Sequence, residues 1–155
     1  MMTTRSSEVL KRLAGKRLAT AESLTGGAIG AAITAVPGAS AVYAGGIVSY
    51  TNRIKQQLLG VAPETLEIYG AVSLQTAREM AAGARKHLES DVAVSVTGLA
   101  GPDSDEYGHP VGTVFIGYAD ESQILAREYH FEGDRESVRR QTVEAALALI
   151  LEYNP

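Results

Sequence analysis

The hydrophobic pattern of the chain alternates between a helical period and runs typical of buried strands. Apolar residues spaced three or four positions apart predict helices at 6–14, 26–36, 52–60, 63–69, 74–88 and from 135 onward. Segments rich in β-branched residues, or alternating in polarity, predict strands at 16–23, 42–50, 91–98, 112–119 and 123–131. Helices interleaved with strands in this way predict an α/β fold.

Local signals refine this pattern. Ser6 or Ser7 is the expected cap of the first helix, and Ser73 and Asp134 are expected to cap two later ones. The near-continuous apolar run at 91–98 is typical of a strand covered on both faces, and Gly45-Gly46 indicates a bulge or a close backbone approach. The turn "DES" between the last two strands predicts an antiparallel hairpin. The expected architecture is a three-layer α/β/α sandwich with a mixed, mostly buried sheet of about five strands.

Composition narrows the classes of function. The 155 residues fit a single domain, and 14 Lys+Arg against 18 Asp+Glu give a net charge of −4, which argues against a nucleic-acid binder. Cysteine is absent, so disulfides, cysteine nucleophiles and thiolate metal sites are excluded. The N-terminal segment has no continuous apolar core, and the sequence has no run of about 20 apolar residues. We therefore expect a soluble, cytoplasmic protein with no membrane partner.

The stretch "TAESLTGGAIGAA" (20–32) carries the first candidate chemistry, because it joins a predicted strand to a predicted helix. Ligands of open α/β sheets bind beyond the carboxyl ends of the strands, which places Ser23 at a candidate site. Backbone amides of Thr25, Gly26 and Gly27 could hold a phosphate or an oxyanion. The segment matches neither the Walker A loop nor the G-x-S-x-G elbow. From this stretch alone, Ser23 could equally be a helix cap without a ligand.

A serine nucleophile needs a group that takes its proton. The three histidines are poorly placed by position, since only His109 falls on a predicted loop. Lys55 follows a strand end, close in sequence to Tyr50, and burial could lower its pKa far enough for it to act as a base. The simpler interpretation of Lys55 is a solvated lysine on a helix surface.

Two further segments could contribute to the same site. "SVTGLAGP" (95–102) is a second strand-end loop, with Thr97 and Gly98 as candidate ligand contacts, although it could be an ordinary turn. "GDRESVRR" (133–140) places Arg135 and Arg139 in the first turns of a helix, where they could clamp an anion. Unliganded surface arginines are the commoner case.

Six blocks in order carry a resemblance to a known family over about residues 6 to 152. They are "TAESLTGG", "VPGASAVYAGGIVSYTNRIKQQLLGV", "GAVS", "VSVTGLAGP", "PVGTV" and "FEGDRESVRRQ". Together they resemble the CinA C-terminal domain family, whose enzymatic members are nicotinamide-nucleotide amidases. The resemblance implies a single amidohydrolase domain over 1–155, in its stand-alone form. It also makes a homodimer plausible.

The implied reaction is hydrolysis of the carboxamide of nicotinamide mononucleotide to nicotinic acid mononucleotide and ammonia, with no metal or redox cofactor. On this resemblance Ser23 is the nucleophile and Lys55, assisted by Tyr50, is the base. The amides from Thr25 to Gly27 would then hold the oxyanion. Two other functions remain open: a non-catalytic nucleotide-binding module of the same fold, and an amidase for a related small amide.

The sequence departs from the family pattern at two places. Leu24 stands where many relatives have cysteine, which excludes a thiol role there. The loop "DSDEYGHPVGTV" (103–114) has His109 where relatives often carry a lysine, and it lacks their glycine-rich stretch. The phosphate-binding role therefore passes to Arg135 and Arg139, or to Thr97 and the Gly98 amide.

Overall fold

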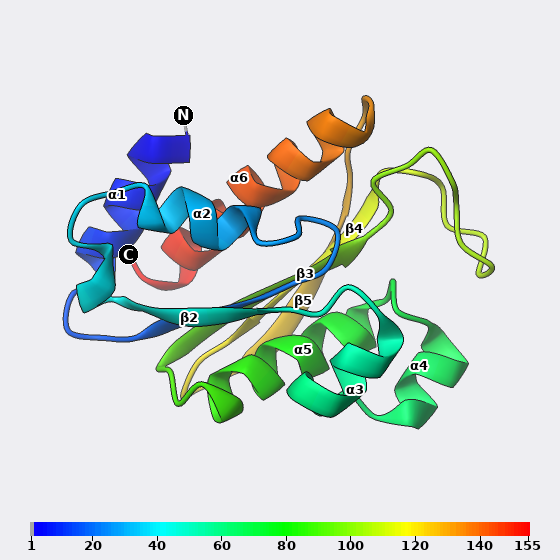
Figure 1. Cartoon of the computed structure of the whole chain (residues 1–155), viewed down its shortest axis with the longest axis horizontal. Coiled ribbons are helices and arrows are strands. Elements are labelled where there is room, and N and C mark those ends of the chain that lie inside the picture. The colour runs from blue at the N-terminus through cyan, green and yellow to red at the C-terminus, as the bar shows by residue number, and fades with distance from the viewer. Residues whose placement is uncertain (1) are drawn as a thin grey trace.

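The computed structural model describes residues 2–155 and contains one five-stranded mixed sheet between two layers of helices (Figure 1). The strands are β1 (Leu18–Glu22), β2 (Tyr43–Val48), β3 (Val92–Gly98), β4 (Thr113–Ala119) and β5 (Ile124–His130). Their order in the sheet is β2-β1-β3-β4-β5. β1 runs parallel to β2 and β3, whereas β4 is antiparallel to β3 and β5. The predicted α/β/α sandwich with a mixed sheet is confirmed.

Two groups of helices cover the two faces of this sheet. One layer holds α1 (Met2–Arg12), α2 (Ala28–Thr34) and α6 (Arg135–Tyr153), and the other holds α3 (Asn52–Leu59), α4 (Pro63–Tyr69) and α5 (Leu74–His87). A short 3-10 helix, Ala39–Ala41, precedes β2. The central strand β3 is buried along almost its whole length, as its β-branched run predicts. Among the described residues, no helix is both long and apolar enough to cross a membrane.

The predicted starts of two helices are wrong. α1 begins at Met2 rather than after a serine cap, and Ser6 lies fully buried inside it. The ion pair between Arg5 and Glu144 of α6, 2.7 Å long, helps to hold this first part of α1 against α6. α2 begins at Ala28 rather than at Gly26, because Gly26 and Gly27 have φ values of 59° and 107°, in the left-handed region that a right-handed helix excludes.

The paired glycines of β2 match their predicted role. The register of β1 against β2 shifts between Leu18 and Ala19, which are paired with Tyr43 and Gly45, so the strand carries an irregularity there. A Cβ atom on Gly46 would overlap the hydroxyl of Thr20 and lie 2.6 Å from that of Tyr43. The close approach of two polar side chains therefore requires glycine at this position.

Strand alternation sets the directions of the two residues at the end of β1. Leu18 packs in the core cluster shared with α2 and α6, whereas Ala19 and Ala21 pack in the cluster shared with α3 and α5. Side chains on a strand alternate between faces, so Glu22 is directed toward α2, and Ser23 continues the opposite series toward α3. The next section shows that both side chains find buried partners on those sides.

Candidate active site

A pocket of about 340 Å³ lies beyond the carboxyl ends of β1 and β3. This is the edge at which an open α/β sheet binds its ligands. Its lining comes from five segments: the turn after β1, the β2–α3 connection with α3, the loop before α5, the end of β3 with the loop that follows it, and the start of α6. The lining residues are Ser23, Leu24, Tyr50, Asn52, Lys55, Ala71, Val72, Thr97, Gly98, Leu99, Ala100, Gly101, Pro102, Asp103 and Arg135.

Ser23 and Lys55 meet at the base of this pocket. The Lys55 Nζ atom lies 3.1 Å from the Ser23 Oγ atom and also donates to the Ser49 carbonyl oxygen at 2.7 Å. Ser23 is 8% exposed and Lys55 is 1% exposed, so the pair is almost removed from bulk water. A hydroxyl next to a buried amine in a pocket is the arrangement of an activated serine nucleophile.

Burial changes the acid–base behaviour of Lys55. Because the charged ammonium is costly to hold away from water, burial lowers the pKa of Lys55 from 10.5 to about 8. About a tenth of the amine is then neutral at pH 7, against a far smaller fraction for an ordinary lysine. In that form its lone pair can accept the Ser23 proton across the same 3.1 Å contact, while an N–H group still donates to Ser49.

Local structure holds Lys55 in this position. Thr51 caps α3 by accepting a hydrogen bond from the Ile54 amide at 3.3 Å, and this places Lys55 on the buried side of the first turn. α3 in turn lies against α5 at Gly83, where any side chain would overlap the Leu59 carbonyl group. The short helix α3, which carries Lys55, can therefore pack this closely against α5 only because residue 83 is glycine.

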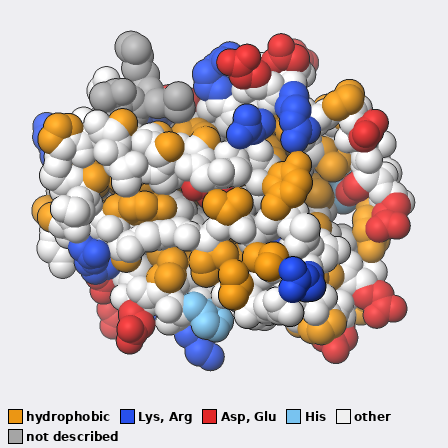
Figure 2. All heavy atoms as spheres, in the orientation of Figure 1, with side chains coloured by type: hydrophobic (Ala, Val, Ile, Leu, Met, Phe, Trp, Pro, Cys, Tyr) orange, Lys and Arg blue, Asp and Glu red, His pale blue; other side chains and the backbone are white. Residues whose placement is uncertain are grey.

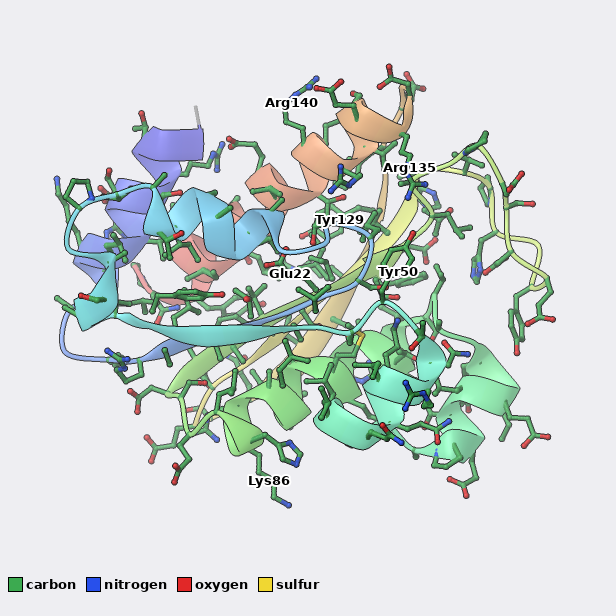
Figure 3. The ribbon with its side chains drawn as sticks, in the orientation of Figure 1. Glu22, Tyr50, Lys86, Tyr129, Arg135 and Arg140 are labelled. Atoms are coloured by element: carbon green, nitrogen blue, oxygen red, sulfur yellow. The ribbon has the colours of Figure 1, made fainter. Side chains whose placement is uncertain are left out.

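Tyr50 lines the pocket but is placed differently from the predicted base partner. Its side chain is 59% exposed, and its hydroxyl accepts a hydrogen bond from Arg135 at 3.2 Å rather than contacting Ser23 or Lys55. Arg135 also donates to the Gly101 carbonyl oxygen at 2.6 Å. Figure 3 shows Tyr50 and Arg135 at the same edge of the sheet. The two side chains form one wall of the pocket. Tyr50 therefore contacts Arg135 and not Lys55, which the sequence suggested that it assists.

The other predicted arginine lies outside the pocket lining. Arg139 donates to the carbonyl oxygens of Leu24 and Thr25 at 2.9 and 3.0 Å, so it fastens the turn that carries Ser23 from the side of α6. Arg135 uses two of its five N–H donors on protein partners, which leaves three within the described structure for a ligand. Of the two arginines, Arg135 is the one placed to meet an anion.

Of the three backbone amides that the sequence predicted to hold an oxyanion, one already has a hydrogen-bond partner. The Gly26 amide donates to the Ser23 carbonyl oxygen at 3.1 Å, and Thr25, Gly26 and Gly27 do not line the pocket. Leu24, the residue after Ser23, does line it. Its backbone amide has no hydrogen-bond partner among the described residues, and because Leu24 lines the pocket whereas the other three do not, this amide is the candidate donor for an oxyanion.

Thr97 and Gly98 lie in the pocket lining, as the sequence suggested. Thr97 Oγ1 donates to the Ala71 carbonyl oxygen at 2.8 Å, which ties the end of β3 to the loop before α5. A Cβ atom on Gly98 would lie 2.7 Å from the Thr113 carbonyl oxygen, so β3 and β4 can approach here only with glycine. Both residues shape the pocket wall.

The divergent loop after β3 folds on itself beside the pocket. Asp105 accepts hydrogen bonds from the His109 amide at 3.0 Å and from its ring Nδ1 at 2.7 Å, and Tyr107 donates to the Glu67 carbonyl oxygen at 3.0 Å. Asp103 lines the pocket itself. Acidic side chains gather along the right-hand edge of Figure 2, the side on which this loop projects. Asp103 therefore adds one carboxylate to a pocket lining that also holds Lys55 and Arg135.

Three residues were missed by sequence reasoning. Glu22 is 2% exposed and accepts three hydrogen bonds, and Asn52 and Asp103 line the pocket. Glu22 directly precedes Ser23 in "ESLTGG", so a charged residue at the end of an otherwise buried strand was the available signal. Over residues 2–155, no group of three His, Asp or Glu side chains is arranged to hold a metal ion.

Comparisons with known proteins identify the family of the chain. The family model of the CinA C-terminal domain matches residues 2–154. The chain belongs to the CinA C-terminal domain family. A CinA-like protein of Geobacter sp. (strain M21) is 46% identical over 145 residues, covering 94% of this chain and 35% of its own length. The chain spans about a third of the length of the curated relatives it matches.

Two solved structures of the family are similar to this CinA domain over nearly its whole length. A competence-damaged protein (CinA) superfamily protein from Escherichia coli has a TM-score of 0.96 and 37% identity, covering 99% of this chain and 90% of its own. The competence damage-inducible protein A (ComA) from Klebsiella pneumoniae has a TM-score of 0.95 and 37% identity, covering 97% and 95%. These likenesses establish the family and the fold.

Proposed function

We propose that this CinA domain hydrolyses the carboxamide of nicotinamide mononucleotide to nicotinic acid mononucleotide and ammonia. The observation that carries this proposal is the buried hydrogen bond between Lys55 Nζ and Ser23 Oγ at the base of the pocket. A hydroxyl with a low-pKa amine beside it suits attack on an amide carbonyl. The identity of the substrate is inferred from the resemblance of the Ser23, Tyr50 and Lys55 motifs to those of the family's nicotinamide-nucleotide amidases.

In the proposed mechanism neutral Lys55 takes the Ser23 proton as Oγ bonds to the carboxamide carbon. The carbonyl π electrons move to oxygen, and the Leu24 amide is placed to stabilise that oxyanion. The tetrahedral intermediate collapses, the C–N bond breaks, and the proton held by Lys55 goes to the leaving nitrogen, which departs as ammonia. Water then adds to the acyl carbon with Lys55 again as base, and Ser23 recovers its proton.

Arg135 is proposed to bind the phosphate of the nucleotide. It is the arginine that lines the pocket, and it has free N–H donors for a second partner. Tyr50, held by Arg135 and exposed on the pocket wall, offers an aromatic face beside which a pyridinium ring could stack. The Asp103 carboxylate in the pocket lining suits the positive charge of that ring.

The substrate is tested by measuring ammonia release from nicotinamide, its riboside and its mononucleotide. We expect the mononucleotide to have the highest kcat/KM, because only it carries the anion that Arg135 can bind. Equal turnover of the three compounds would favour an amidase for a small amide. Calorimetric binding of the mononucleotide with no ammonia over hours would favour a nucleotide-binding module.

The Arg135→Ala variant is expected to raise KM for the mononucleotide by about 10- to 100-fold, since a charge-assisted hydrogen bond contributes about 1.5 to 3 kcal/mol. The riboside lacks the phosphate, and its KM should change little. Steady-state kinetics on both compounds check this, with Arg53→Ala on the outer surface of α3 as the control. An equal loss on both compounds would contradict a phosphate-binding role.

The rate should also depend on pH through Lys55. Its pKa of about 8 means that the neutral base is the minor form at pH 7 and the major form above about pH 8. We therefore expect kcat/KM to rise about tenfold per pH unit up to that value and then to level off. A pH–rate profile from about pH 6 to about pH 10 measures this. A flat profile across this range would contradict the role of Lys55 as base.

A further inference from the structure

Glu22 connects the two halves of the Ser23–Lys55 pair. Its carboxylate is 2% exposed and accepts hydrogen bonds from Thr25 Oγ1 at 2.6 Å, the Ile29 amide at 2.9 Å and the Gly30 amide at 3.0 Å. Three donors thus converge on one buried carboxylate. In Figure 3 the Glu22 label marks the interior of the molecule, between α2 and the sheet.

These bonds fix the turn that carries the nucleophile. The turn from Ser23 to Gly27 contains two residues in the left-handed region, and α2 has no side-chain cap from its own N-cap residue. Glu22 takes the place of that cap by reaching forward from the end of β1 to the first amides of α2. The carboxylate therefore spans the turn and holds its two ends at a fixed separation.

The backbone of Glu22 holds the other half of the pair. Its carbonyl oxygen accepts the Ser49 amide at 2.7 Å and the Ser49 hydroxyl at 3.4 Å. The Ser49 carbonyl oxygen in turn accepts the 2.7 Å hydrogen bond of Lys55 Nζ. One residue thus holds, through its side chain, the turn of Ser23 and, through its main chain, the acceptor that orients Lys55.

The hydrogen bonds between Glu22 and the start of α2 have a second consequence. The Ile29 and Gly30 amides, which would otherwise be free at the start of α2, already serve an internal anion. A substrate phosphate at that position would meet the buried negative charge of Glu22. The glycine-rich stretch is therefore closed to phosphate, in agreement with the position of Arg135 in the pocket lining, to which Gly26 and Gly27 do not belong.

We infer that Glu22 is a positioning residue for the proposed amidase reaction: it sets the Ser23 hydroxyl at hydrogen-bonding distance from Lys55 without touching the substrate. This inference rests on the proposed function of Ser23. A small misplacement of reacting groups can reduce a rate about 100-fold, so the effect should fall on kcat. KM should stay near its native value, because Glu22 does not line the pocket.

The experiment compares kcat, KM and thermal unfolding of the native chain with Glu22→Gln and Glu22→Ala. Glutamine keeps an acceptor for Thr25 and Ile29 but turns an N–H group toward the Gly30 amide, so we expect kcat to fall about 10-fold, and about 100-fold in Glu22→Ala. The midpoint of the pH–rate profile should not move, since burial of Lys55 is unchanged. An unchanged kcat in folded Glu22→Gln would overturn the inference.

Glu79 provides a matched control, because its carboxylate also holds a helix start. It accepts hydrogen bonds from the Ala62 amide at 2.8 Å and from Thr65 Oγ1 at 2.7 Å, at the beginning of α4, outside the pocket lining. Glu79→Gln should lower the unfolding temperature while leaving kcat unchanged. If Glu79→Gln lowers kcat as much as Glu22→Gln does, the effect is general destabilisation and the inference fails.

Thr25 gives a milder test should the Glu22 variants fold poorly. Thr25→Val removes one of the three hydrogen bonds at nearly constant volume, and Thr25→Ser restores it. We expect kcat to fall in the first variant and to recover in the second. Equal kcat in both would overturn the inference. The native chain and Ser23→Ala separate the levels. No ammonia from the native chain refutes the proposed function, and native turnover by Ser23→Ala refutes Ser23 as its nucleophile. An inactive Ser23→Ala beside a fully active, folded Glu22→Gln refutes only the positioning role.

Discussion

Ser23→Ala is expected to release ammonia from nicotinamide mononucleotide at least about 10⁴-fold more slowly than the native chain, because no other hydroxyl replaces the attacking oxygen. Ser23 is 8% exposed and lines the pocket, so the loss of its hydroxyl should leave the fold intact. Binding of the nucleotide should persist, since Arg135 and the pocket walls are unchanged. Ammonia release and calorimetric binding measure the two quantities separately.

Ser95 is the matched control for this substitution. It is a buried strand serine whose hydroxyl donates to the Ala77 carbonyl oxygen at 2.6 Å, and it does not line the pocket. Ser95→Ala should cost about 1 kcal/mol of unfolding free energy and leave kcat unchanged. Native turnover by Ser23→Ala would refute the nucleophile assignment.

Lys55→Met is expected to lower kcat by about 10³-fold or more, because methionine fills a similar volume but cannot accept a proton. Lys86→Met, at an exposed position near the end of α5, is the control and should retain native kcat. If Lys55→Met kept the native rate and pH profile, the base would have to be another group. Steady-state kinetics with nicotinamide mononucleotide provide the measurement.

The same variant has a stability signature whose sign follows from the pKa of Lys55. Between about pH 8, the folded value, and 10.5, the ordinary value, the unfolded chain binds more protons at this lysine than the folded chain does. The unfolding free energy of the native chain should therefore gain up to about 3 kcal/mol from Lys55 as pH rises through this range. Lys55→Met should lack this gain. Identical pH slopes in urea unfolding of the two proteins would show that Lys55 is not desolvated.

Much of the fold could be predicted because short sequence signals, such as β-branched runs and helix caps, determine many of its individual strands and helices. The β-branched run of β3 indicated a strand buried on both faces, and Ser73 and Asp134 cap α5 and α6 as expected. The start of α1 could not be predicted, since Ser6 resembles a cap in sequence but is buried by the neighbouring helices. Tertiary packing determines where α1 begins, so the sequence of α1 alone could not predict this boundary.

The meeting of Ser23 and Lys55 was predictable in outline and not in detail. Both follow strands that end at the same edge of the sheet, which brings their segments together. The direction of a long side chain depends on packing between elements distant in sequence, so the pairing of Tyr50 with Arg135 was not visible. The buried carboxylate of Glu22 was missed because a glutamate is ordinarily solvated and its three donors lie three to eight residues further on.

Turnover of nicotinamide mononucleotide by the native chain, measured beside Ser23→Ala, tests the assigned chemistry most directly. Ammonia and nicotinic acid mononucleotide are quantified together in both reactions over the same period. We expect the native chain to form the two products in equal amounts and Ser23→Ala to form neither above background. Tight binding of the nucleotide by the native chain without either product, or equal product from both proteins, would contradict a Ser23–Lys55 amidase.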